Sequence, residues 1–103
     1  MKIVLVTAPA DVAEPLARKI LEARLAACVS LVPGVRSIYR WKGAVETSDE
    51  VQLVVKTRDS KASELTSWIA TQHPYEVPEV VVVAVEHAAA AYAKWIEDEL
   101  RAS

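Results

Sequence analysis

Short runs of mostly apolar residues, rich in valine, recur along the chain. They occupy residues 3–6, 28–32, 51–56 and 80–85, and polar or proline-containing segments separate them. Apolar runs of this length without alternation are typical of strands that are buried on both faces. The pattern therefore predicts at least four strands.

Between these runs and after the last one, apolar residues recur at helical spacing, which predicts three helices. Asp11 and Glu14 have the form of a capping box, and Pro15 suits a first helical turn, so the first helix is expected to begin there. Asp59 or Ser60 is expected to cap the second helix, which stops before the proline at position 74. The apolar stripes of the three helices are Val12, Leu16 and Ile20; Ala62, Leu65, Trp68 and Ile69; and Tyr92, Trp95, Ile96 and Leu100. These stripes should face the core, which places Trp68 and Trp95 in it.

Residues 35–41 alternate between two faces, and Lys42 and Gly43 turn the chain back into residues 44–56. This pattern predicts a hairpin, with a bulge or bend at residues 33–34 (Pro-Gly). Residues 28–41 would span roughly 46 Å at about 3.3 Å per residue, whereas a globule of this size has a radius of gyration of about 13 Å. The hairpin is therefore expected to overhang its own domain.

The element order is β-α-β-β-α-β followed by a further helix. It predicts an α+β fold, the ferredoxin-like split βαβ sandwich, formed by one domain over residues 1–103. Helices would cover one face of the sheet, while the apolar strands make the other face apolar as well. An exposed apolar face of this size seldom persists on a monomer, so we expect a closed homo-oligomer.

Composition narrows the classes of function. Fourteen acidic against twelve basic residues leave a net charge of −2, which argues against nucleic-acid binding. The single cysteine, Cys28, allows no internal disulfide and is expected in the core, whereas His87 is expected in a loop. The first apolar run is too short for a signal peptide, and no run is long enough to cross a membrane. We therefore expect a cytoplasmic protein with no membrane partner.

Three segments carry a specific likeness to a known family: residues 26–43 (AACVSLVPGVRSIYRWKG), Lys56-Thr57 and residues 73–79 (HPYEVPE). In order and without large insertions, they resemble the CutA family of divalent-cation tolerance proteins. The likeness runs from Thr7 to Trp95 and covers nearly the whole chain. It implies a homotrimer in the cytoplasm, an association with tolerance to copper and other divalent metals, and an architecture like that of the PII signalling proteins.

The resemblance also bears on metal ligands. The family's proposed copper ligands are a cysteine in the first strand and two histidines before the proline, but this chain has Val6 in the strand and Gln72 before His73. His73 is thus the one metal-ligand candidate, with Glu76 and Glu79 close to it in sequence. The alternative is that His73 only ends the second helix. Copper or another divalent metal is a candidate ligand, and no cofactor is required.

A second set of residues mixes aromatic rings, a cation and carboxylates in segments that the resemblance places near subunit boundaries. Its members are Tyr39, Trp41, Lys56, Tyr75, Glu76 and Glu79. Such a mixture is common in small-ligand clefts, although tyrosine and tryptophan are also enriched in plain protein interfaces. Both alternatives stay open from the sequence.

Three functions are compatible with these features. The first is a cytoplasmic trimer that supports tolerance to divalent metals, copper above all, through weak metal binding. The second is a PII-like regulatory module that binds a small metabolite or a protein partner at intersubunit clefts. An enzyme comes last, because no pattern of nucleophile, base and oxyanion donors is present.

Overall fold

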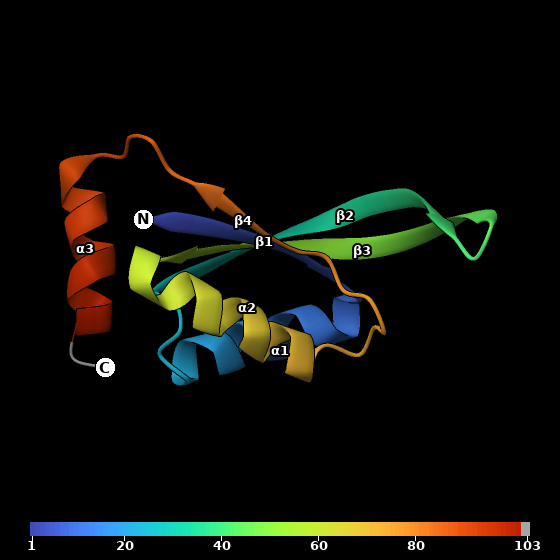
Figure 1. Cartoon of the computed structure of the whole chain (residues 1–103), viewed down its shortest axis with the longest axis horizontal. Coiled ribbons are helices and arrows are strands. Elements are labelled where there is room, and N and C mark those ends of the chain that lie inside the picture. The colour runs from blue at the N-terminus through green and yellow to red at the C-terminus, as the bar shows by residue number, and fades with distance from the viewer. Residues whose placement is uncertain (102–103) are drawn as a thin grey trace.

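The computed structural model describes residues 1–101, so Ala102 and Ser103 of the predicted domain lie outside the described residues. The elements, in chain order, are β1 (Lys2–Ala8), α1 (Ala10–Glu22), β2 (Cys28–Trp41), β3 (Ala44–Thr57), the 3-10 turn η1 (Asp59–Lys61), α2 (Ala62–Gln72), β4 (Val80–Ala84) and α3 (Ala90–Arg101). Figure 1 shows them in one layer of strands with helices below it and at one end. The predicted order of strands and helices is confirmed.

The four strands form one sheet in the order β2-β3-β1-β4, and every neighbouring pair is antiparallel. The first strand therefore lies inside the sheet, between β3 and β4. This is the arrangement that the split βαβ pattern predicts, and the predicted α+β, ferredoxin-like fold is confirmed. Strands β2 and β4 form the two edges.

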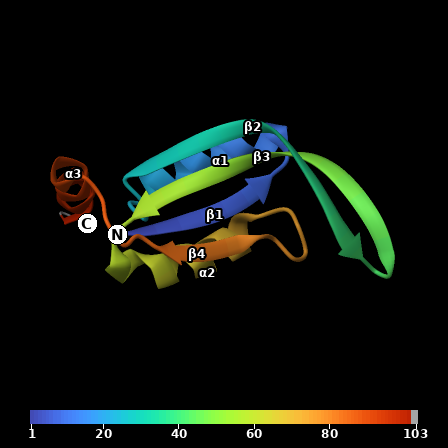
Figure 2. The same cartoon turned by 90° about the horizontal axis from the view of Figure 1, so that it is seen from above.

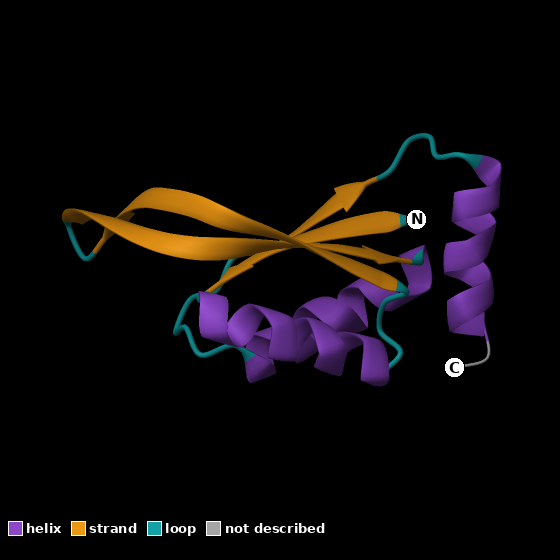
Figure 3. Cartoon of the chain, turned by 180° about the vertical axis from the view of Figure 1, so that it is seen from behind, coloured by secondary structure: helices purple, strands orange, loops and turns teal. Residues whose placement is uncertain are grey.

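Helices α1 and α2 cover the same face of the sheet, as Figure 3 shows from behind. Side chains at alternate positions of β1 and β3 point to these helices, and Val4, Leu53 and Val55 among them are fully buried. Ile20 of α1 and Leu65 of α2 meet them from the other side of the core. The core thus lies between one sheet face and two helices.

The hairpin of β2 and β3 extends far beyond the two helices, which Figure 2 shows from above. The molecule measures 44 × 25 × 21 Å, and its radius of gyration is 14.2 Å. The register of the two strands shifts between Val32 and Val35, where Gly34 adopts a φ of +74°. The predicted overhang and the predicted bulge at residues 33–34 are both confirmed.

The opposite face of the sheet is not covered by any helix of the described chain. By register, Leu5 on this face lies beside Val54 and Val81 of the neighbouring strands. Val81 is 48% exposed, so the predicted apolar open face is present. Cys28 also lies on this face, opposite Lys56, and it is half-buried rather than in the core as predicted. The prediction was wrong because the strand run at 28–32 belongs to an edge strand with one open face.

Two helix starts differ from the prediction. Helix α1 begins at Ala10, and the carbonyl of Pro9 accepts the first backbone hydrogen bonds, so no side chain caps the helix. Pro15 lies in the second turn, where it is exposed and the carbonyl that it leaves without an intrahelical donor can bond to water. Glu14 pairs with Arg18 one turn later instead of capping.

The second helix likewise begins without a side-chain cap, after the 3-10 turn at Asp59–Lys61. Asp59 bonds to the amino group of Met1 at 2.8 Å, which lowers the pKa of its carboxyl group. Its side chain is therefore engaged with the residue that precedes β1 rather than with the helix that it was expected to cap.

The two helical tryptophans have different environments. Trp68 packs partly buried against the core, as predicted. Trp95 is 42% exposed and stacks on Tyr92, with ring centroids 5.9 Å apart, so its predicted core position was wrong. The helix stands at one end of the sheet (Figure 1), where Ile96 and Leu100 are buried but Tyr92 and Trp95 find no cover within one chain.

Candidate functional site

A cleft of about 530 Å³ lies where the hairpin leaves the body of the protein. Four segments form it: the end of β1, the outer halves of β2 and β3, and the loop between α2 and β4. Its lining residues are Thr7, Ser37, Tyr39, Arg40, Trp41, Ser48, Glu50, Tyr75, Glu76, Val77 and Glu79. A volume of this order suits a small organic molecule.

Glu50 is the most buried charged residue of this cleft. Glu50 is 7% exposed, and its Oε2 accepts a hydrogen bond of 2.9 Å from the Tyr75 hydroxyl. Burial, together with the bond to this carboxylate, raises the pKa of Tyr75 to about 12. The phenol therefore stays protonated at neutral pH and remains a donor to Glu50.

His73 holds the loop against β1. Its Nε2 lies 2.8 Å from the Thr7 carbonyl oxygen, and its Nδ1 accepts a hydrogen bond of 3.1 Å from the Tyr75 backbone N–H. Because a carbonyl only accepts, Nε2 carries the proton and the ring is in one fixed tautomer. The imidazole also packs against the Tyr75 ring, with centroids 4.6 Å apart. His73 thus positions Tyr75 in the cleft wall, and its backbone ends α2 by a bond from its N–H to the Ile69 carbonyl.

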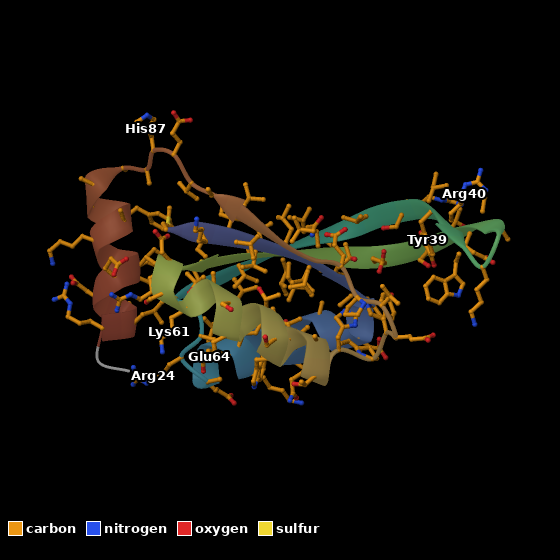
Figure 4. All side chains as sticks on the ribbon, in the orientation of Figure 1. Arg24, Tyr39, Arg40, Lys61, Glu64 and His87 are labelled. Carbon is orange, nitrogen blue, oxygen red and sulfur yellow. The ribbon has the colours of Figure 1, made fainter. Side chains whose placement is uncertain are left out.

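The outer wall of the cleft comes from the hairpin. The Tyr39 hydroxyl lies 2.8 Å from Ser48 Oγ across the two strands. The Lys42 ammonium group lies over the Trp41 ring, 5.7 Å from its centroid. Figure 4 shows Tyr39 and Arg40 near the tip of the hairpin. Tyr39 and Trp41 are 41% and 37% exposed in the single chain, so their rings are accessible.

The inner wall is tied to the sheet by an amide. Gln52 Nε2 donates to the Val6 carbonyl at 3.0 Å and lies 3.4 Å from Glu79 Oε2. The loop carrying Tyr75 and Glu79 is thereby attached both to β1 and to β3.

The structure brings together five of the six residues that the sequence singled out as a cleft. Tyr39, Trp41, Tyr75, Glu76 and Glu79 all line it. The sixth, Lys56, lies elsewhere on the open face, where its ammonium group bonds to Ser30 Oγ and lies 3.9 Å from Cys28 Sγ. The ligand-binding role of the set stays a prediction.

Sequence reasoning missed Glu50 and did not assign Arg40 to the cleft. Arg40 is exposed, and it also lines the cleft. The sequence held one indication for Glu50: it directly precedes the apolar run at residues 51–55, and alternation along β3 places its side chain on the open face of the sheet. Its hydrogen-bond partner Tyr75 is distant in sequence, and no pattern within β3 reveals that contact.

Metal ligands do not gather anywhere in residues 1–101. No group of three or more His, Cys, Asp and Glu side chains in this part of the chain is placed to hold a metal ion. His87, the other histidine, lies in the loop before α3, as predicted, with its side chain 92% exposed. Figure 4 places it at the far end of the molecule from Tyr39.

Known proteins match this chain over nearly its whole length. The family described as "CutA1 divalent ion tolerance protein" matches residues 2–99. The divalent-cation tolerance protein CutA of Pectobacterium atrosepticum is 43% identical over 100 residues, which cover 96% of this chain and 91% of that protein. The chain belongs to the CutA1 family.

Other members of the CutA1 family support this relation. "Protein CutA homolog" of Xenopus laevis is 48% identical over 94 residues, or 90% of this chain, which spans 62% of the length of the frog protein. The apo structure of the PII-like protein CutA from Nostoc sp. PCC 7120 superposes with a TM-score of 0.91 at 38% identity, with 97% of each chain covered. A structure from Archaeoglobus fulgidus, described as a periplasmic divalent cation tolerance protein, has a TM-score of 0.91 at 31% identity and covers 97% of this chain and 99% of that one. The resemblance to CutA is thereby confirmed.

Within residues 1–101, no helix is both long and apolar enough to span a membrane.

Proposed function

We propose that this member of the CutA1 family contributes to divalent-cation tolerance as a cytoplasmic homotrimer that binds a small ligand in the cleft between hairpin and loop. The observation that carries the proposal is the buried Glu50 carboxylate, held by Tyr75 in the wall of a 530 Å³ cleft. Such a convergence of aromatic surface and a few placed polar groups is typical of ligand sites. The role is binding and regulation rather than catalysis.

Assembly into a trimer is supported by the surfaces that one chain leaves uncovered. Val81 and Val83 are 48% and 42% exposed on the open face of β4, which is an edge strand. Apolar faces and free strand edges of this kind are usually covered by another chain. The hairpin overhangs the body and would reach a neighbouring copy. The number three rests on the resemblance to the family.

Weak copper binding through His73 is the other mechanism that the sequence predicts, and it stays a prediction. Both ring nitrogens of His73 are engaged, with the Thr7 carbonyl and the Tyr75 N–H. A copper ion would have to displace the Tyr75 N–H from Nδ1, the one nitrogen with a lone pair. Since this costs a part-buried hydrogen bond of about 1 kcal/mol, the geometry favours the cleft over a copper centre.

Native mass spectrometry of the metal-stripped protein during a copper titration tests this proposal, because one spectrum reports subunit number and bound copper together. His73→Gln retains an amide N–H for the Thr7 carbonyl and removes the imidazole. His87→Gln is the matched control at an exposed histidine.

We expect a trimer without a fixed copper count, and the same behaviour in both variants. A whole-number uptake of copper that His73→Gln abolishes and His87→Gln preserves would show a copper site at His73. That result would contradict the proposal that the cleft is the functional site. A monomer would contradict the assembly.

A further inference from the structure

The charges that line the cleft are mainly negative. Glu50, Glu76 and Glu79 contribute three carboxylates, and Arg40 contributes the one guanidinium group. Within residues 1–101, none of the three carboxylates takes part in an ion pair. Glu50 is the decisive one, because at 7% exposure it has the Tyr75 phenol as its donor but no positive charge beside it. A buried carboxylate without a cation is costly, and a bound cation would offset that cost.

The aromatic rings of the cleft also suit a cation. Tyr39, Trp41 and Tyr75 place three electron-rich rings around the same space. One of them already attracts a positive group, since the Lys42 ammonium lies 5.7 Å from the centroid of Trp41. Groups of aromatic side chains recognise quaternary and methylated ammonium ions through their negative faces.

A small metal ion does not fit this arrangement. Divalent cations need several ligand atoms within about 2.0–2.6 Å of one point, and no such group of His, Cys, Asp and Glu exists in residues 1–101. The negative charges of the cleft are spread over β3 and the loop at residues 75–79. A cation with an organic frame can meet dispersed carboxylates and rings together.

From these observations we propose that the cleft takes an organic ammonium ion, a small molecule with a quaternary or alkylated amino group, with Glu50 as its charge partner and Trp41 as its aromatic wall. This inference rests on the proposed function and names the ligand class of the same cleft. The cation sits between the loop and the hairpin. Its binding neutralises Glu50 and draws the two segments together.

Isothermal titration calorimetry with two probes tests the ligand class. The probes are choline and its neutral analogue, in which a carbon atom replaces the quaternary nitrogen, so that shape is kept and charge is removed. The analogue also shows whether the cleft accepts small molecules at all, which separates the ligand class from the proposed function.

The variants are chosen in matched pairs. Glu50→Gln removes the charge, while its amide oxygen still accepts from Tyr75. Asp49→Asn removes a neighbouring charge on the other face of the strand, outside the cleft. Trp41→Leu removes an exposed ring of the cleft, and Trp95→Leu removes an equally exposed ring of α3. Native mass spectra of each variant check that the subunit number is unchanged.

We expect choline to bind about tenfold more tightly than its neutral analogue. Glu50→Gln and Trp41→Leu should each weaken choline binding by about tenfold, while Asp49→Asn and Trp95→Leu leave it unchanged. Equal binding of the two probes would overturn the cation class and leave the cleft as a ligand site. If neither probe binds, or if the control variants weaken choline as much as the cleft variants, the inference is wrong.

Discussion

The hydrogen bond between Tyr75 and Glu50 should be the most stabilising polar contact of the cleft, and Tyr75→Phe tests it. The variant keeps the ring beside His73 and removes only the hydroxyl that donates to Oε2 at 2.9 Å. Hydrogen bonds to charged groups contribute about 1.5–3 kcal/mol, and the acceptor here is 7% exposed. We therefore expect the free energy of unfolding to fall by about 2 kcal/mol.

The matched control is Tyr39→Phe, which removes a hydroxyl that lies 2.8 Å from Ser48 Oγ on the exposed hairpin. Water replaces that bond, so the loss should be about 0.5 kcal/mol or less. Urea unfolding at one fixed protein concentration measures both variants, because oligomer stability depends on concentration. Repeating Tyr75→Phe in a Glu50→Gln background should reduce its cost to about 1 kcal/mol, since the acceptor is then neutral. Equal losses for the two tyrosine variants would refute the reasoning.

Burial of Tyr75, together with this bond to Glu50, sets a pH dependence at the alkaline end. The pKa of Tyr75 in the folded protein is raised to about 12 from an ordinary value of 10.0. The unfolded chain therefore releases this proton first, and stability that is fully present below pH 10 is lost as the pH rises towards 12. The slope of stability against pH over this interval should be smaller in Tyr75→Phe than in the wild-type protein.

Three other predictions concern assembly, the hairpin turn and the last helix. Val81→Lys places a charge on the open apolar face and should shift the protein from the proposed trimer to a monomer in light scattering after gel filtration, whereas Ser67→Lys on exposed α2 should not. Gly43→Ala adds a side chain at a φ of +83° and should lower the free energy of unfolding by about 1 kcal/mol without any clash; an unchanged urea midpoint would contradict this. The hydrogen bond from Lys94 holds the pKa of Asp98 below its usual value, so NMR titration of Lys94→Ala should show a higher pKa for Asp98. In the wild type, the stabilisation is present at pH values above the pKa of Asp98 in the unfolded chain, and it is lost as the pH falls through the pKa of Asp98 in the folded protein.

The strands and their order could be predicted because their signals are local and mutually consistent. The runs around Val4 and Val81 mark strands wherever they pack, and the turn at Lys42 and Gly43 fixes the hairpin between them. The helix starts were less accessible. Asp11 has the composition of a cap, but the carbonyl of Pro9, two residues earlier, accepts the first bonds.

The candidate site could be predicted only as a set of residue types. Tyr39 and Tyr75 were singled out by their kind and by the family resemblance, and the structure places them around one cleft. The central carboxylate, Glu50, was missed because its burial comes from Tyr75, 25 residues later in the chain. His73 was singled out, but its contact with the Thr7 carbonyl, 66 residues away, was not predicted. Contacts between distant segments are set by the fold, and single-residue patterns do not contain them.

The cleft is the centre of this account, and a growth assay tests its role most directly. A bacterial strain that lacks its own CutA1 family member would be challenged with copper while it expresses the wild-type protein or one variant at equal level. The account predicts that Glu50→Gln and Trp41→Leu lose protection although they assemble normally, and that Asp49→Asn and Trp95→Leu protect like the wild type. Full protection by both cleft variants would contradict it.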